Sequence, residues 1–290
     1  MILIADSGST KTHWCLMTAS GHRQVFSTEG LNPFFMSDEQ MLAVINDQLL
    51  PQIAKHLWAG TITHVFFYGA GCTPQKSPLL AEVIRRVFTR SMAVVESDML
   101  GAARALFGNG QGVACILGTG SNSALYDGKG FVKQVPALGF ILGDEGSGAV
   151  LGKRLVSDLL KNQLPAELRD MFFAQYNLTQ ADIIERVYRQ PLPNRFLASL
   201  SPFCAEHIDH SAIYQLVLDH FRAFVSRNVL QYFESPSSGL RVGFVGSVAH
   251  YYREPLCRVL DEFNLPKADI VQDPMEGLCR YHANDLTPTM

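Results

Sequence analysis

Short apolar runs separated by turns of small residues mark the start of the chain. The run Ile2–Ala5 and a second run that begins at Trp14 flank one such turn, and a third run follows at Val25–Ser27. Apolar runs of this length, bounded by Gly, Ser and Thr, are typical of buried β-strands. The pattern therefore predicts three strands joined by tight turns.

Strands and helices then alternate up to residue 107. Ser37 precedes a stretch with apolar residues at helical spacing that runs to about Leu57, and a Ser before such a stretch indicates a capped helix. The same reasoning predicts, in order, a buried strand at 65–68, a helix at 77–88, a short strand at 93–95 and a helix at 99–107. This alternation indicates an α/β fold.

The pattern restarts at Val113. An apolar run, Val113–Leu117, precedes the small-residue turn Gly-Thr-Gly-Ser-Asn-Ser, and strands at 124–126 and 131–135 follow. This order repeats that of residues 1–27 at a separation of roughly 110 residues, which indicates an internal duplication. We therefore expect two similar α/β halves, each with its own small-residue turn.

The rest of the chain completes the second half. A Gly-rich connection, Leu138–Gly148, leads into a helix at 149–160 and a mostly helical stretch at about 161–235. A strand at 241–245, a helix from Gly246-Ser247 to about 263, a strand at 268–271 and a last helix from Asp273-Pro274 complete the pattern. The predicted domains are 1–106 and 107–290, the second with a helical insertion at 161–235.

The composition excludes several classes of protein. The 290 residues are 47% apolar and 18% charged, which is ordinary for a globular protein long enough for two domains. A net charge of −3 without a Lys/Arg stripe argues against a nucleic-acid partner. The longest uncharged run, 105–126, is too rich in Gly, Asn, Ser and Thr for a membrane span.

The six cysteines are widely spaced, and no pair has the CxxC spacing of a zinc or iron–sulfur site. His207 and His210 lie three residues apart on an expected helix, but no further metal ligand accompanies them. Scattered thiols and an N-terminus without the features of a signal peptide lead us to expect a cytoplasmic protein.

The first turn has the chemistry of a phosphate site. Gly8 lets a ligand approach the backbone, free N–H groups in such a turn suit a phosphate, and Ser9, Thr10 and Thr12 add hydroxyl groups. Asp6 could hold a hydrated Mg²⁺ beside that phosphate. A Gly-Ser hairpin turn with an incidental Asp is the alternative. The P-loop and dinucleotide fingerprints are not matched.

Three motifs, in this order, resemble those of the actin-like superfamily of sugar kinases, Hsp70 proteins and actin. Residues 6–12 (DSGSTKT) are similar to the first phosphate motif, 117–121 (LGTGS) to the second, and 243–248 (GFVGSV) to the adenosine motif. The resemblance covers nearly the whole chain. It implies two ribonuclease H-like domains, a duplicated actin-like ATPase fold, with a nucleotide and sugar cleft between them.

The same resemblance implies ATP and Mg²⁺ as cofactors. The residues that it places at ATP are Gly8, Ser9, Thr10 and Lys11 in the first turn, Gly118, Thr119 and Gly120 in the second, and Gly246 and Ser247 near the adenosine. Asp6 would hold the Mg²⁺ through water, and Lys11 would attract phosphate as a surface charge.

Within this superfamily the chain is similar to the N-acetylglucosamine kinase family, which is grouped with the activator ATPases of 2-hydroxyacyl-CoA dehydratases. The similarity lies in the segment 143–147 (GDEGS), in Asp98 after the strand at 93–95, and in Asn32 after the third strand. It implies that Asp98 is the base acting on a sugar hydroxyl and that Asn32 and Asp144 bind sugar hydroxyls. Asp98 could instead cap the helix at 99–107, and Glu145 is expected to cap the helix at 149–160.

One departure from the family concerns the sugar. Its acetylglucosamine kinases often carry a Gly-Trp pair where this chain has Ala137 and Leu138. Leu138 is therefore expected in the substrate site, and Phe34 could match an aromatic residue found soon after the loop Asn. N-acetylglucosamine, glucosamine and N-acetylmuramic acid all remain admissible.

The expected function is an ATP-dependent kinase acting on O6 of an amino sugar. A dehydratase-activating ATPase would need cysteines for a shared iron–sulfur cluster, and their wide spacing argues against it. A sugar-responsive regulator would carry a helix-turn-helix before the first motif, but a strand begins at Ile2. A sugar-binding protein without activity is the third alternative. The expected partners are the sugar and ATP, without nucleic acid or membrane, and a homodimer is left open.

Overall fold

The chain divides into two compact units in the computed structural model, which describes residues 1–8, 10–59, 61–233 and 239–286. Unit 1 comprises Met1–Gly110, Asp127–Gly130 and Asp273–Met290, and unit 2 comprises Gln111–Tyr126 and Phe131–Gln272. Ser9 lies outside the described residues, so its role at a phosphate stays a prediction.

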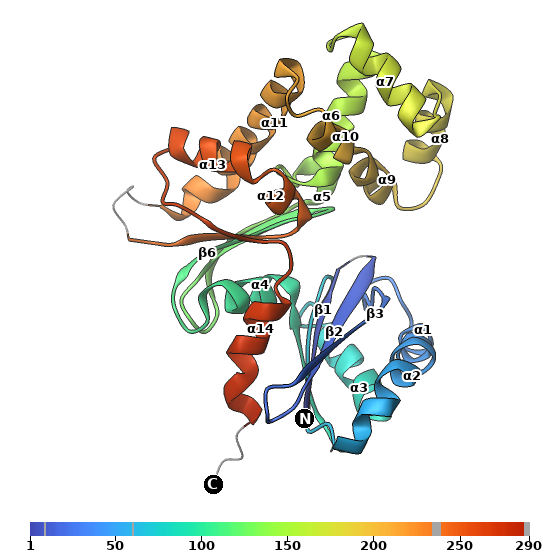
Figure 1. The fold of residues 1–290 in the computed structure, drawn as a ribbon, viewed down its shortest axis with the longest axis vertical. Coiled ribbons are helices and arrows are strands. Elements are labelled where there is room, and N and C mark those ends of the chain that lie inside the picture. Colours follow the sequence, from blue (N-terminus) through green and yellow to red (C-terminus); the bar gives the residue numbers. More distant parts are fainter. Residues whose placement is uncertain (9, 60, 234–238, 287–290) are drawn as a thin grey trace. The chain divides into compact units, whose positions relative to one another are not determined.

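Unit 1 contains a five-stranded sheet with helices on both faces (Figure 1). Its strands are β1 (Ile2–Ser7), β2 (Lys11–Met17), β3 (Arg23–Glu29), β4 (His64–Gly69) and β5 (Met92–Ser97). Its helices are α1 (Asp38–Ala43), the π-helix η1 (Val44–Leu49), α2 (Leu50–Ile53), the 3-10 helix η2 (Ala54–Ala59), α3 (Ser77–Val87), α4 (Asp98–Phe107), α14 (Met275–Tyr281) and the 3-10 helix η5 (His282–Leu286).

The sheet of unit 1 has the order β3-β2-β1-β4-β5, in which β1, β4 and β5 are parallel and β2 and β3 are antiparallel to their neighbours. Successive side chains of a strand point to opposite faces. Leu3 and Ala5 of β1 therefore pack with α1 and α3, whereas Ile2 and Ile4 pack with α14. Asp6, two residues beyond Ile4, lies on the α14 face.

Unit 2 repeats this sheet with a longer insertion. Its strands are β6 (Gly112–Leu117), β7 (Ser121–Tyr126), β8 (Phe131–Val135), β9 (Val242–Val245) and β10 (Asp269–Val271). Its helices are α5 (Gly139–Leu142), α6 (Gly148–Leu160), α7 (Ala166–Tyr176), α8 (Gln180–Tyr188), α9 (Pro193–Leu200), α10 (Pro202–Glu206), α11 (Ser211–Phe224), the π-helix η3 (Val225–Val229), the 3-10 helix η4 (Leu230–Tyr232), α12 (Ser247–Tyr251) and α13 (Arg253–Glu262).

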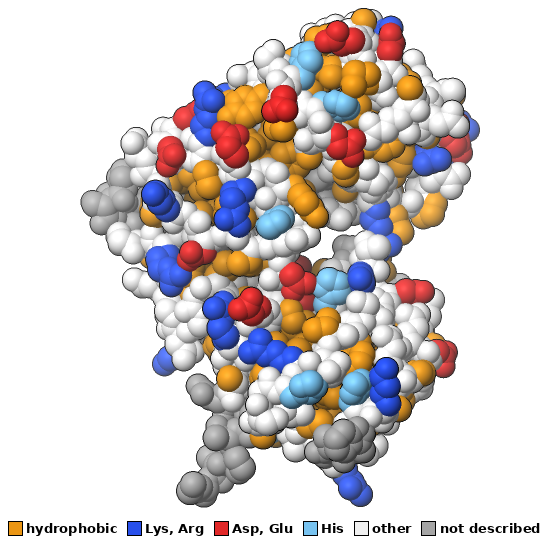
Figure 2. All heavy atoms as spheres, in the orientation of Figure 1, with side chains coloured by type: hydrophobic (Ala, Val, Ile, Leu, Met, Phe, Trp, Pro, Cys, Tyr) orange, Lys and Arg blue, Asp and Glu red, His pale blue; other side chains and the backbone are white. Residues whose placement is uncertain are grey.

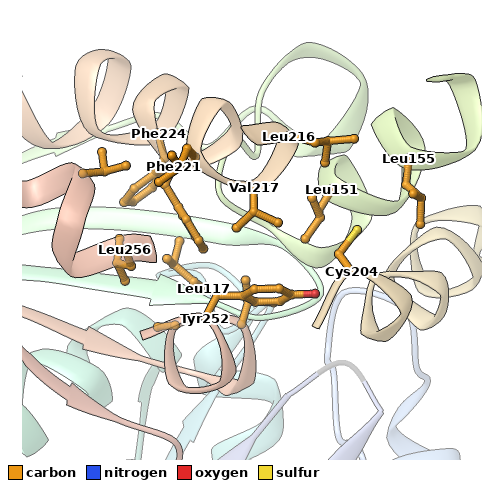
Figure 3. Packing of buried hydrophobic residues seen from close by; sticks show 14 of the residues in the cluster. Leu117, Leu151, Leu155, Cys204, Leu216, Val217, Phe221, Phe224, Tyr252 and Leu256 are labelled. Carbon is orange, nitrogen blue, oxygen red and sulfur yellow. The ribbon is translucent and has the colours of Figure 1, made fainter. Parts of the chain in front are cut away.

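The order of the second sheet is β10-β9-β6-β7-β8. Read from β8, it places the third, second, first, fourth and fifth strands of its unit side by side, as in unit 1. The predicted duplication and fold class are therefore confirmed, as is the mostly helical insertion. In the core of unit 2, Leu117 at the end of β6 lies near Phe221 and Phe224 of α11 and Tyr252 (Figure 3). The residue before the second small-residue turn is thus anchored by apolar packing.

The C-terminal segment belongs to a different unit than predicted. The prediction placed all of 107–290 in the second domain, whereas Asp273–Met290 is part of unit 1. Met275, Leu278 and Cys279 of α14 pack against Ile2 and Ile4, so the last helix belongs to unit 1. Gly277 permits this packing, because a Cβ there would lie 2.3 Å from the Ala105 carbonyl oxygen of α4.

Charged side chains of both signs are interspersed on the face drawn in Figure 2. Among the described residues, no helix combines the length and apolar character that crossing a bilayer requires.

Candidate active site

The first small-residue turn connects β1 to β2. The Gly8 N–H donates to the Lys11 carbonyl oxygen over 3.0 Å, which closes the turn, and Thr10 and Lys11 are exposed. A Cβ on Gly8 would meet only the Lys11 oxygen, at 3.8 Å. The fold would therefore accept alanine at this position, and the glycine leaves room for a ligand.

The loop that carries Asn32 is held beside this turn. The Ser7 and Thr12 hydroxyl oxygens are buried 2.7 Å apart, and the Leu31 N–H donates to Ser7 Oγ over 3.0 Å. The Gly30 N–H donates to the Thr10 carbonyl oxygen over 3.1 Å. The Thr12 hydroxyl is therefore used inside unit 1 and is not offered to a phosphate as the sequence suggested.

The Asn32 side chain lies against the loop after β4. Its Oδ1 accepts a 2.9 Å hydrogen bond from the Phe34 N–H, and a Cβ on Gly71 would lie 2.1 Å from the same oxygen. Gly71 also has a φ of +79°, which favours glycine. Phe34 and Phe35 beside it are exposed, with their rings 5.0 Å apart.

Asp98 begins α4 directly after β5. Ser97 is the N-cap, because its Oγ accepts from the Leu100 N–H over 3.2 Å, so the N-cap is not Asp98. Asp98 Oδ1 accepts from the Met99 N–H over 2.8 Å. Burial raises the pKa of Asp98, and the Met99 hydrogen bond opposes that shift. The carboxyl group lies at the carboxyl end of a parallel strand, where α/β sheets bind ligands.

Asp6 lies near two other carboxyl groups. Burial raises its pKa to about 8, and the charges of Asp273 and Asp98 add to the shift. Asp273 Oδ2 lies 2.6 Å from His13 Nδ1, and His13 pairs with Asp6 across β1 and β2. Asp273 also accepts from the Met275 N–H over 2.7 Å.

Asp273 and His13 were missed as site residues. Asp273 follows β10 much as Asp98 follows β5, so the duplication could have signalled it. Among the described residues no three His, Cys, Asp or Glu side chains are arranged to bind a metal directly. The charges of Asp98 and Asp273 near Asp6 would favour a cation there, so the carboxyl groups present fit a hydrated Mg²⁺.

The second small-residue turn, Gly118–Gly120, connects β6 to β7. The Gly118 N–H donates to the Gly120 carbonyl oxygen over 2.9 Å. A Cβ on Gly118 would meet no atom within 4 Å, whereas one on Gly120 would lie 3.1 Å from Asp144 Oδ2. Gly118 thus matches Gly8 in leaving open space at the turn, and Thr119 is half-buried beside it.

The segment Gly143–Ser147 is hydrogen-bonded to this turn. The Gly148 N–H donates to the Gly118 oxygen over 2.8 Å, and the Ala149 N–H donates to the Thr119 oxygen over 3.1 Å. Ser121 Oγ donates to the Glu145 carbonyl oxygen over 2.6 Å. The segment and the turn therefore form one framework.

Asp144 has a left-handed backbone with a φ of 55°, and its N–H donates to the Ala137 carbonyl oxygen over 3.0 Å. Burial raises the pKa of Asp144 to about 6, while a backbone hydrogen bond from Ser121 opposes the shift and the charge of Glu145 adds to it. The carboxyl group is thus held at the second turn, where it can accept from a ligand.

Two expectations about this segment change. Ser147 caps α6, with its Oγ accepting from the Val150 N–H over 3.1 Å, so the cap is not Glu145. Glu145 instead forms an ion pair with Arg227, with Oε1 2.6 Å from Nε. Leu138 is left-handed with a φ of 66° and 60% exposed, so its side chain is open to a ligand.

Gly246 follows β9 and packs against the end of β6. It has a φ of 123°, and a Cβ would lie 2.3 Å from the Leu117 carbonyl oxygen. Its N–H donates to the Val271 oxygen over 3.0 Å, and Ser247 begins α12 with an exposed side chain. The adenosine motif therefore adjoins the second turn within unit 2.

Comparison with solved structures identifies similar proteins over the full length of the chain. A protein from Porphyromonas gingivalis, to which N-acetylglucosamine kinase activity is ascribed, is 49% identical with a TM-score of 0.94, covering 99% of this chain and 100% of its own. A Chromobacterium violaceum protein ascribed the same activity is 16% identical with a TM-score of 0.73, covering 97% and 99%.

A ROK family glucokinase from Streptomyces griseus, solved with glucose and AMPPNP, is 15% identical with a TM-score of 0.60, covering 100% of this chain and 99% of its own. The last two likenesses show the fold alone. No family model matches the chain, and no curated protein does.

Proposed function

Because this chain belongs to the N-acetylglucosamine kinase family of the actin-like superfamily, we propose that it transfers the γ-phosphate of ATP to O6 of N-acetylglucosamine or a related hexosamine. The observation that carries the proposal is Asp98. Its carboxyl group lies just after β5 at the carboxyl end of a parallel strand, and Ser97 rather than Asp98 is the N-cap of α4.

Asp98 would act as the general base. It would accept the proton of the sugar hydroxyl as that oxygen attacks the γ-phosphorus and ADP leaves. Burial raises the pKa of Asp98, and a base whose pKa approaches the working pH transfers protons more effectively. General base catalysis of this kind contributes about 10²–10⁴-fold to a rate.

The two small-residue turns would bind the ATP phosphates, since Gly8 and Gly118 both leave open space beside the backbone. Mg²⁺ bound there would supply positive charge that neutralises the charge developing during transfer. Asp6 would hold the ion through water. Gly246 and Ser247 would lie at the adenosine.

The sugar hydroxyls would be bound by Asn32 and Asp144. The Asn32 amide nitrogen has no protein hydrogen-bond partner among the described residues, so it can donate to a hydroxyl. Above its pKa of about 6, Asp144 is a carboxylate and can accept hydrogen bonds from two sugar hydroxyls. Both side chains lie in segments tied to a phosphate turn, which supports joint binding of sugar and nucleotide.

The cysteines support a kinase over a dehydratase-activating ATPase. Five of the six are buried, Cys257 is half-buried, and burial raises the pKa of Cys72, Cys115 and Cys204. A cluster shared with another subunit would need exposed thiolates.

The test is a panel of glucose, glucosamine, N-acetylglucosamine and N-acetylmuramic acid with Mg-ATP, read by release of ADP and by ³¹P NMR of the product. We expect stimulation by at least one amino sugar and a phosphate signal coupled to the C6 protons. Equal ADP release with and without every sugar would overturn the proposal.

A further inference from the structure

Unit 2 contains a pocket of about 370 Å³ that adjoins the segment carrying Asp144. Its walls include Gly143 and Glu145, the two neighbours of Asp144 in the chain, together with Leu138, Leu142, Arg227 and Asn228. A volume of this size lies within the range of small-molecule pockets. None of the roles considered above for ATP or for sugar hydroxyls uses it.

The carboxamide of Asn228 lines this pocket and has an oxygen that no protein group in the described residues uses. Asn228 is 8% exposed, its Nδ2 lies at a long 3.5 Å from Glu145 Oε2, and its Oδ1 has no protein partner among the described residues. The Asn228 oxygen is not among the enclosed side-chain atoms that lack a partner, so it is accessible from the pocket. A ligand that donates a hydrogen bond can therefore reach Asn228 Oδ1.

The backbone around the pocket departs from regular structure at two places. Arg227 and Asn228 lie in the π-helix η3, and single π-turns of this kind occur frequently at functional sites. Leu138 is left-handed while its side chain stays 60% exposed. A left-handed conformation costs a non-glycine residue free energy, and such strain clusters where ligands bind.

The charges in the pocket balance. Arg227 Nε lies 2.6 Å from Glu145 Oε1, so the two charges cancel and the lining favours a neutral ligand. The remaining groups comprise an acceptor at Asn228 Oδ1, guanidinium donors on Arg227, and the exposed aliphatic side chains of Leu138 and Leu142. An amide with an alkyl group has the complementary features: an N–H for the acceptor, a carbonyl oxygen for the donor and an apolar chain for the leucine side chains.

We propose that this pocket binds the acylamino group of the sugar and prefers acyl chains longer than acetyl. The amide N–H would donate to Asn228 Oδ1, Arg227 would donate to the amide oxygen, and the alkyl chain would lie on Leu138 and Leu142. An acetyl group would fill only a small part of about 370 Å³. The inference rests on the proposed function, because Asp144 places the sugar ring beside the pocket.

The test compares kcat/KM for glucosamine and its N-acetyl, N-propanoyl and N-butanoyl derivatives. We expect an increase of about tenfold from N-acetyl to N-butanoyl, because burial of two methylene groups has that effect. In Leu142→Ser, the ratio of kcat/KM for the N-butanoyl sugar to that for the N-acetyl sugar should fall to about twofold. Ile141→Ser is the matched control, because Ile141 is exposed on the same helix at 75% but does not line the pocket.

Equal kcat/KM for the three acyl sugars, or an equal loss of the ratio in both serine variants, would overturn the inference and leave the kinase proposal standing. Turnover of no sugar would overturn the kinase proposal instead. Calorimetric titration of the same sugars without ATP then tests the pocket separately. Affinity that rises with chain length in the wild type and not in Leu142→Ser supports it, and equal affinities contradict it.

Discussion

The two units attach a loop to a turn with different proportions of side-chain and backbone hydrogen bonds. In each unit, the loop that carries a proposed sugar-binding residue is bonded to that unit's small-residue turn. In unit 1 the buried hydroxyls of Ser7 and Thr12 bind the segment at Leu31, next to Asn32. In unit 2 the N–H groups of Gly148 and Ala149 bind the turn directly. Each unit also uses the other kind of group, because the Gly30 N–H donates to the Thr10 oxygen and Ser121 Oγ donates to the Glu145 oxygen. The shared feature is therefore the attachment of loop to turn, and the units differ in which groups contribute most of the bonds.

The two turns also differ in charge. Asp6 is the penultimate residue of β1, and the corresponding residue of β6 is Ile116. Asp98 and Asp273 lie near Asp6, whereas the carboxyl group of Asp144 lies close to the backbone of the second turn. Under the proposed function, the two units would divide the reaction, with acid–base and metal chemistry in unit 1 and mainly binding in unit 2.

The strongest test of this division is Asp98→Asn. We expect kcat to fall by about 10³-fold, because the amide cannot accept the hydroxyl proton, while the Kd of ATP changes less than threefold. Steady-state ADP release and calorimetry with AMPPNP measure the two quantities. Ser97→Ala is the control, since it removes the helix cap without removing the carboxyl group. Near-native turnover of Asp98→Asn would show that the base is another group.

The equivalence of the turns can be tested with Gly8→Ala and Gly118→Ala. Neither added Cβ meets an atom closer than 3.8 Å, so the Tm should stay within a few degrees of the wild type. If phosphates approach both backbones, each variant should weaken ATP binding about tenfold. Gly246→Ala provides the contrast, because its Cβ would lie 2.3 Å from the Leu117 oxygen and should destabilise the fold. Unchanged ATP affinity in either turn variant would remove that turn from the nucleotide site.

The binding role of unit 2 predicts a pH dependence. Burial raises the pKa of Asp144 to about 6, so its carboxylate is the main form above that pH and is lost below it. If sugar hydroxyls donate to this carboxylate, the KM for sugar should rise about tenfold for each pH unit below 6 and stay level above it. Asp144→Asn should have a higher KM at pH 8 and no such dependence, and a profile unchanged by the substitution would argue against this role.

The smallest expected effect concerns the helix caps. Ser97 caps α4 in unit 1, and Ser147 caps α6 in unit 2. Replacing either with alanine should lower the free energy of unfolding by about 1 kcal/mol, measured in urea. Only Ser147→Ala should also raise the KM for sugar, because that residue anchors the segment at Asp144. If the KM for sugar changed equally in both variants, the change would result from lower stability of the fold and not from the anchoring of the Asp144 segment.

The sequence by itself determined the order of strands and helices, the duplication and the motif positions. These features depend on neighbouring residues: apolar runs define strands, helical spacing defines helices, and small residues define turns. Asp98 and Asp144 were identified as candidates through the resemblance of their segments to the N-acetylglucosamine kinase family, and their roles stay predictions.

Only the tertiary structure decided which distant residues meet. His13 and Asp273 are 260 positions apart, and no local pattern signals that packing of α14 brings them together near Asp6. The same holds for Glu145, which local spacing favoured as a cap but which pairs with Arg227. Contacts of this kind depend on how the helices pack on the sheets, and that packing is set by the whole chain.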